Sequence, residues 1–103
     1  MDHEVIFHPA ALAELEDLYD VIASRSSPST ARGFVTGLTD YCTDLSTFPK
    51  RGTERREVMP GIRIVGYRRV VSIVFTVETN KVLIIGIFYS GRNITMDLLE
   101  KRT

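Results

Sequence analysis

Apolar side chains recur through the first half of the chain at the three- and four-residue steps of an α-helix. The spacing predicts one helix from Pro9 to about Ser24 and a second helix, capped by Ser27, that ends at Pro49. Because only a short turn joins the two helices, we expect them to pack antiparallel. The first stripe comprises Leu12, Leu15, Leu18, Tyr19 and Ile22. The second comprises Ala31, Phe34, Leu38, Tyr41, Leu45 and Phe48.

After Phe48 the pattern changes to the alternation of β-strands, interrupted by glycine and proline. Thr79 and Asn80 form a compact hairpin turn in this interpretation, and Gly86 inside the last strand indicates a β-bulge or a close neighbour. A short helix is expected over residues 95–101. The strands are expected over residues 4–8, 55–59, 62–67, 71–78 and 82–89.

These elements predict a single α+β domain over residues 1–103. We expect a short N-terminal strand, an antiparallel helical hairpin packed on a mostly antiparallel β-sheet meander, and a short C-terminal helix. The strand over residues 82–89 is apolar on both faces, whereas only the short last helix is available for the second face. An incompletely covered apolar face would indicate a binding partner.

Charge divides unevenly along a chain whose net charge is zero. Residues 1–48 carry eight acidic and two basic side chains, a net charge of −6, whereas residues 49–103 carry eleven basic and five acidic ones, a net charge of +6. Ten of the thirteen bases are arginines, which bind carboxylates and phosphates in a forked geometry. The division favours an acidic partner for the second half. The alternative is a solvated sheet edge protected by charge.

Little in the inventory suggests a metal, cofactor or nucleophile. His3, His8 and Cys42 lack a recurring ligand spacing, and there is no phosphate-binding glycine loop or nucleophile elbow. Cys42 is expected to be a buried small hydrophobe, and the carboxylates of the first helix, from Glu14 to Asp20, a solvated face. We expect no cofactor and no metal.

The sequence also favours a cytoplasmic protein. A single cysteine cannot form an intramolecular disulfide, the N-terminus lacks the pattern of a secretory signal, and no apolar run reaches the length of a membrane span. What remains for chemistry is arginine and tyrosine on a sheet. Arg63, Tyr89 and Arg92 could form an RNA-cleaving site, but only with a group that exchanges protons near neutral pH, and arginine cannot do so.

Several segments, taken in order, resemble the ParE branch of the RelE/ParE toxin superfamily. They are the strand end FHP at residues 7–9 before an acidic helix, FPKRG at 48–52, GIR at 61–63, the hairpin over 73–87, and FYSGRN at 88–93. The resemblance implies the fold described above and a bacterial toxin of a type II toxin–antitoxin pair, neutralised by a ParD-like antitoxin. It further implies that DNA gyrase is the target, and that the protein is not an enzyme.

RelE-like relatives instead cleave messenger RNA in the ribosome, with a Tyr or His in the C-terminal segment. No Tyr or His follows Arg92 here, which favours the ParE branch. Three interpretations stay open: a gyrase inhibitor, a ribosome-dependent mRNA interferase with Arg63, Tyr89 and Arg92 as catalytic residues, and a weakly toxic member that only binds its partner. We expect Tyr89 and Arg92 to bind the target. The residues expected to bind antitoxin carboxylates are Arg55, Arg56, Arg63, Arg68 and Arg69.

Overall fold

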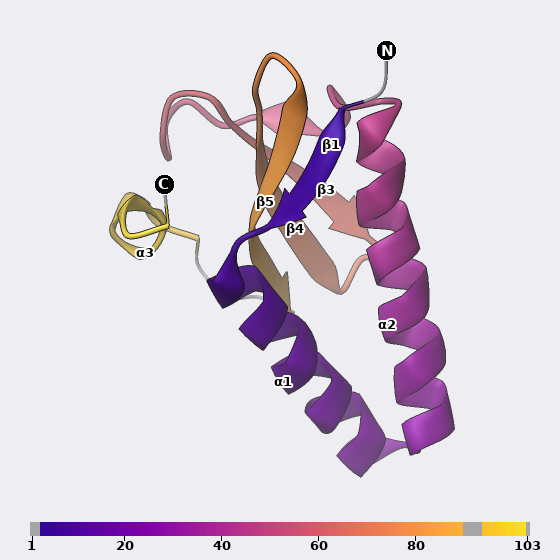
Figure 1. Cartoon of the computed structure of the whole chain (residues 1–103). Coiled ribbons are helices and arrows are strands. Elements are labelled where there is room, and N and C mark those ends of the chain that lie inside the picture. The colour runs from indigo at the N-terminus through magenta and orange to yellow at the C-terminus, as the bar shows by residue number, and fades with distance from the viewer. Residues whose placement is uncertain (1–2, 90–93, 103) are drawn as a thin grey trace.

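The computed structural model, which describes residues 3–89 and 94–102, has the predicted α+β class (Figure 1). Its sheet has the strand order β1-β5-β4-β3-β2, in which β1 is parallel to β5 and the other neighbours are antiparallel. The helices are α1 (Pro9–Arg25), α2 (Pro28–Thr43), the 3₁₀-helix η1 (Asp44–Ser46) and α3 (Met96–Glu100). The strands are β1 (Glu4–Phe7), β2 (Thr53–Glu54), β3 (Ile62–Tyr67), β4 (Val71–Val77) and β5 (Lys81–Tyr89).

Both long helices begin as the sequence predicts. Ser27 accepts a hydrogen bond from the Thr30 backbone N–H at 3.1 Å, and Pro28 occupies the first turn of α2. The ring of His8 caps α1 in the same way, because its Nδ1 accepts from the Ala10 N–H at 3.0 Å. Each cap satisfies one of the backbone donors that a helix N-terminus leaves unpaired.

The predicted end of the second helix is wrong. The α-helix stops at Thr43 and continues as η1, so that Phe48 leaves the buried stripe and its side chain is 59% exposed. A 3₁₀ turn has about 3.0 residues rather than 3.6. The change in rotation keeps Leu45 in the core and turns later positions away from it.

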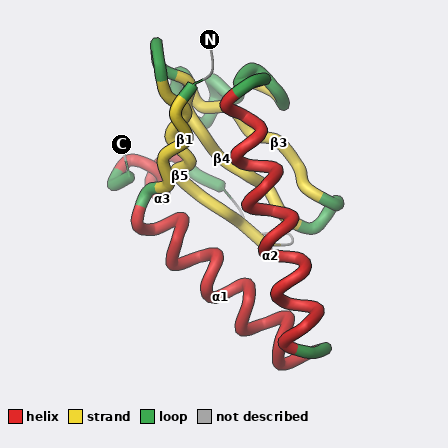
Figure 2. Tube along the Cα trace, turned by 45° about the vertical axis from the view of Figure 1, so that its right-hand side comes forward, coloured by secondary structure: helices red, strands yellow, loops and turns green. Residues whose placement is uncertain are grey.

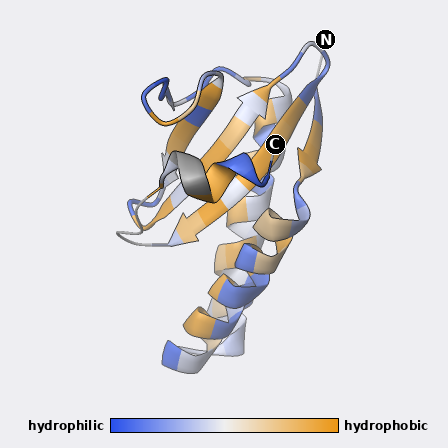
Figure 3. Ribbon diagram, turned by 90° about the vertical axis from the view of Figure 1, so that its left-hand side faces the viewer, coloured by the Kyte–Doolittle hydropathy of each residue, from blue (hydrophilic) through white to orange (hydrophobic). Residues whose placement is uncertain are grey.

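Two apolar cores lie on opposite faces of the sheet. The helical hairpin covers the first core, in which Leu38, Ile73 and Phe75 are fully buried (Figure 2). On the second face, α3 lies across the sheet (Figure 3). The helix α3 and the turn before β3 cover Val74 and Ile85, and Leu99 of α3 is fully buried there. The centre of the second face is therefore better covered than the sequence suggested.

Gly86 lies at a β-bulge, as predicted. The register between β4 and β5 shifts by one residue, because Val74 pairs with Gly86 whereas Phe75 pairs with Ile84. A Cβ atom at Gly86 would lie 2.4 Å from a ring carbon of Phe88. Both the bulge and the close neighbour therefore favour glycine.

The predicted edge strand over residues 55–59 is wrong. The edge strand β2 is only two residues long, and residues 55–59 form a turn in which the Val58 and Met59 N–H groups donate to the Arg55 carbonyl. The turn places Val58 and Met59 against the second core, which an extended strand at the sheet edge would not do. The predicted hairpin at Thr79 and Asn80 is confirmed by the Glu78 N–H, which donates to the Lys81 carbonyl at 2.8 Å.

Candidate functional site

The turn between β3 and β4 presents two arginines in a strained backbone conformation. Arg68 and Arg69 have φ angles of 51° and 62°, the left-handed region, and the Val70 N–H closes the turn by donating to the Tyr67 carbonyl at 3.2 Å. Glycine and asparagine usually occupy such positions, because a larger L-residue there costs about 1–2 kcal/mol. Strain retained with two exposed charges makes this turn a candidate binding site.

The two arginines of this turn have different surroundings. The Arg68 guanidinium carbon lies 5.5 Å from the ring centroid of Tyr67 and 6.0 Å from that of Phe34, so the sheet and α2 orient it. Arg69 has no hydrogen bond or ion pair to any described residue. Its charge is therefore available to a partner.

Arg55 and Arg56 lie in the exposed turn that follows β2, and both have acidic neighbours. Arg55 pairs with Glu57, and Arg56 Nε lies 3.1 Å from Glu54 Oε2. The hydrogen bond from Arg55 lowers the pKa of the Glu57 carboxyl from its ordinary value. A partner carboxylate at this turn would compete with these local ion pairs, which are weak because they are solvated.

Arg63, on β3, holds the loop that precedes β2. Its guanidinium donates to the carbonyl oxygens of Lys50 at 2.7 Å, Arg51 at 3.1 Å and Gly52 at 3.2 Å. A structural role for this side chain could not be read from the sequence. The positive charge remains, but the geometry of the guanidinium is committed to the loop.

The five predicted antitoxin-binding arginines form two groups. Arg55 is joined to the start of β3, since its N–H donates to the Ile62 carbonyl at 2.9 Å, and Arg63 and Arg56 belong to the same end. Arg68 and Arg69 follow the other end of β3. A six-residue strand places the two groups about 17 Å apart.

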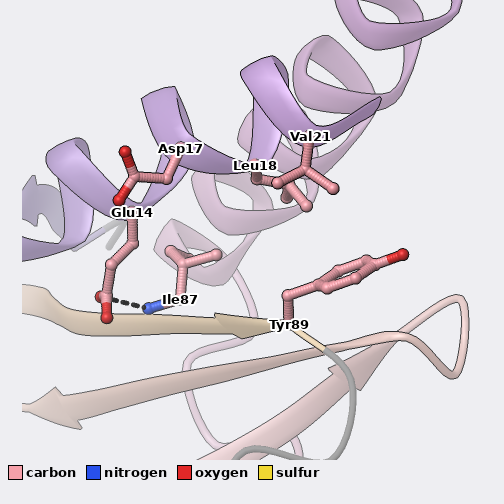
Figure 4. A pocket seen from close by; sticks show the side chains of 6 residues that line it. All are labelled: Glu14, Asp17, Leu18, Val21, Ile87 and Tyr89. Carbon is pink, nitrogen blue, oxygen red and sulfur yellow. Dashed lines mark hydrogen bonds between the residues drawn. The ribbon is translucent and has the colours of Figure 1, made fainter. Parts of the chain in front are cut away.

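Tyr89, one of the two predicted target-binding residues, lies at the end of β5 and is 37% exposed. Its ring borders a small hollow of about 120 Å³ between α1 and β5 (Figure 4). The other predicted residue, Arg92, lies outside the described residues. The hollow is lined by Glu14, Asp17, Leu18, Val21, Ile87 and Tyr89.

Glu14 contradicts the prediction that the α1 carboxylates are solvated. Its side chain is only 12% exposed and accepts from Arg102 at 2.9 and 3.2 Å and from the Ile87 N–H at 3.0 Å. Arg102, also 12% exposed, donates to the Ile85 carbonyl and stacks on Phe88. This pair was not predicted from the sequence. The available signal was helical spacing, since Glu14 lies on the same stripe as the buried Ala11 and Leu18.

The other candidate groups are structural. Cys42 is fully buried in the first core, as predicted, and burial raises the pKa of its thiol to about 12.

Across residues 3–89 and 94–102, no three His, Cys, Asp or Glu side chains gather as metal ligands would. Within the same residues, no helix combines the length and apolar character needed to cross a bilayer.

Comparison with known proteins identifies the family. Residues 5–94 match the family model described as "ParE toxin of type II toxin-antitoxin system, parDE". The chain belongs to this ParE toxin family. A solved structure titled "Chromosomal ParDE TA system from P. aeruginosa" has the same fold, with a TM-score of 0.75 and 22% identity, over 85% of this chain and 96% of that one. A search of curated proteins finds no match.

In this ParE-family chain, Arg63 and Tyr89 do not form one site. Arg63 is paired with Phe75 on β4, whereas Tyr89 is paired with Val71, which lies four residues before Phe75 on the same strand. That offset corresponds to about 13 Å along the strands, with β4 between the two residues. A catalytic set containing both side chains would need a large rearrangement.

Proposed function

We propose that this ParE-family toxin inhibits DNA gyrase in the cytoplasm and is neutralised by a ParD-like antitoxin. The family match over residues 5–94 carries the proposal. The fold that it shares with a chain of the ParDE system from P. aeruginosa supports it.

Two observations favour a gyrase inhibitor over an mRNA interferase. Residues 93–103 include neither Tyr nor His, the side chains with the usual proton-transfer role of RelE-like nucleases. Arg63 donates to three loop carbonyls and is far from Tyr89 along the sheet. Under this proposal Tyr89 and Arg92 contact gyrase rather than RNA.

The basic second half of the chain supports an acidic antitoxin segment as the partner. Arg68 and Arg69 form one group of exposed bases, and Arg55, Arg56 and Arg63 form the other, in which Arg55 and Arg56 are already paired with Glu57 and Glu54. A flexible antitoxin tail could reach both groups, because about 17 Å is the length of five or six extended residues. Binding to exposed charges should weaken as salt screens them.

Expression without the antitoxin tests the target. The proposal predicts growth arrest, DNA-damage signalling and relaxed plasmid DNA while messenger RNA stays intact. Normal supercoiling during growth arrest would exclude gyrase inhibition. Cleaved transcripts in translating extracts would instead support the interferase, and harmless expression would select a member that only binds its partner.

Charge reversal tests the antitoxin surface. Arg69→Glu is the clearest variant, because the Arg69 side chain bonds to no described residue. At low salt it should weaken antitoxin binding about tenfold, whereas Arg25→Glu, which changes an exposed base at the end of α1, should not. Arg63→Glu is a poor test, since it also releases the loop at residues 50–52.

A further inference from the structure

Hydrogen bonds from the Arg63 side chain hold the loop between η1 and β2 in one conformation. Arg63 binds three successive carbonyls, those of Lys50, Arg51 and Gly52. Gly52 has a φ of 73°, and a Cβ atom there would lie 2.3 Å from the Ile64 carbonyl oxygen. A loop with so many fixed backbone groups is preorganised, which lowers the entropy cost of binding through it.

This rigid loop presents an aromatic side chain and two bases to solvent. Phe48, 59% exposed, is the most exposed of the large apolar side chains in the described residues. The Arg51 guanidinium carbon lies 5.2 Å from the Phe48 ring centroid and 5.4 Å from that of Tyr41. Arg51 therefore fixes the position of the Phe48 ring without covering it.

Two adjoining hollows continue from this ring. The first, of about 590 Å³, is lined by residues 47–51, and the second, of about 230 Å³, lies across the start of β3 and the end of β4. The two hollows meet at Lys50, which lines both, and we name them together the Phe48 groove. The second hollow is lined by Lys50, Glu54, Gly61, Arg63 and Val77.

The charge of the groove indicates which kind of segment would bind there. Its apolar part, at Phe48 and Pro49, leads into a polar part with three bases, Lys50, Arg51 and Arg63. The single acid of the groove, Glu54, is already paired with Arg56. A segment that places an apolar side chain beside Phe48 and carboxylates beside Lys50 would match both parts.

We propose that the Phe48 groove binds the acidic antitoxin segment, with one apolar antitoxin side chain packed on Phe48 and an adjacent carboxylate on Lys50. The inference rests on the proposed antitoxin and names a contact that the arginine groups alone do not provide. Charged contacts at an interface rim chiefly steer association, whereas an aromatic anchor commonly supplies much of the affinity. The groove would therefore govern how slowly the complex dissociates.

The test measures affinity and dissociation rate between this toxin chain and a full-length ParD-like antitoxin that neutralises it. Phe48→Ala should weaken binding about tenfold or more at both low and high salt, mainly through faster dissociation. Lys50→Glu should weaken it mainly at low salt. The matched controls are Leu12→Ala, which truncates an exposed apolar side chain on α1, and Arg32→Glu, which reverses an exposed base on α2. Both controls should bind like wild type.

Each outcome decides between the two proposals. If Phe48→Ala and Lys50→Glu both bind the antitoxin with wild-type affinity, the groove proposal is wrong and the antitoxin proposal stands. If the wild-type chain does not bind the antitoxin, both proposals are wrong. If the toxin self-associates and Phe48→Ala abolishes this self-association, the groove binds a second copy of the chain instead. Urea unfolding of each variant excludes a folding defect, because an exposed Phe48 contributes little to the core.

Discussion

The ion pair between Glu14 and Arg102 is predicted to hold the C-terminal segment against α1 and β5. Glu14 accepts from both terminal nitrogens of Arg102 and from the Ile87 N–H, and Arg102 also donates to the Ile85 carbonyl at 3.0 Å. These backbone groups lie beyond Ile84, where the pairing of β5 with β1 ends. The pair therefore satisfies the exposed edge of β5 that β1 does not reach.

The size of the effect follows from burial. Breaking a fully buried ion pair costs about 3–5 kcal/mol, because it leaves an uncompensated charge. Both side chains here are 12% exposed, so solvent reduces this cost and we expect a loss of about 2 kcal/mol, below that range, for either single variant. Glu14→Gln keeps an acceptor for the Ile87 N–H and removes mainly the ionic contact, whereas Arg102→Met also removes the hydrogen bond to the Ile85 carbonyl and the charge beside the Phe88 ring.

Equilibrium urea unfolding of the two single variants and the double variant measures this energy. A loss of about 2 kcal/mol at a slope near 1.5 kcal/mol per molar lowers the midpoint by about 1.3 M. The double variant should lose less free energy of unfolding than the two single variants lose together, by about 1 kcal/mol or more. Glu16→Gln, an exposed carboxylate on the same helix, should stay within about 0.5 kcal/mol of wild type. Additive losses, or single losses as small as that of Glu16→Gln, would show that the contact between Glu14 and Arg102 does not stabilise the fold.

The remaining predictions concern three other positions. Arg69→Gly should raise the midpoint of thermal unfolding by a few degrees, since it relieves left-handed strain, while weakening antitoxin binding; lower stability would show that the turn is not strained. Gly86→Ala should lose about 1–3 kcal/mol in urea unfolding, because the added methyl group would overlap the Phe88 ring, and a neutral result would contradict the packing at the bulge. Because burial raises the Cys42 pKa to about 12, the unfolded thiol ionises first as pH rises. The ionisation of Cys42 should therefore lower the free energy of unfolding as pH rises from about 9 towards 12, so the wild-type value should fall more steeply over this range than that of Cys42→Ala.

Local patterns predicted the elements whose stability depends on their own sequence. The helix start at Ser27 and the bulge at Gly86 were readable because capping and glycine geometry are local. The end of α2 was not, since the periodicity that includes Phe48 continues across the change to a 3₁₀-helix. The edge strand was misplaced because packing of Val58 on the second core, rather than local alternation, decides the conformation of residues 55–59.

The candidate site was only partly readable for a similar reason. Net charge by position located the basic half, but the sequence could not show that Arg63 is committed to the loop carbonyls whereas Arg69 bonds to none of the residues that the structure describes. Those differences arise from contacts between residues more than ten positions apart. Exposed Phe48 was missed because a residue on an apolar stripe is usually buried.

Supercoiling of relaxed plasmid DNA by purified gyrase is the direct test of the proposed gyrase inhibition by this ParE-family toxin. We expect the purified chain to block supercoiling in a dose-dependent way, prior addition of the antitoxin to restore it, and Tyr89→Ala to weaken the block. Full supercoiling at a large molar excess of folded toxin would show that gyrase is not the target.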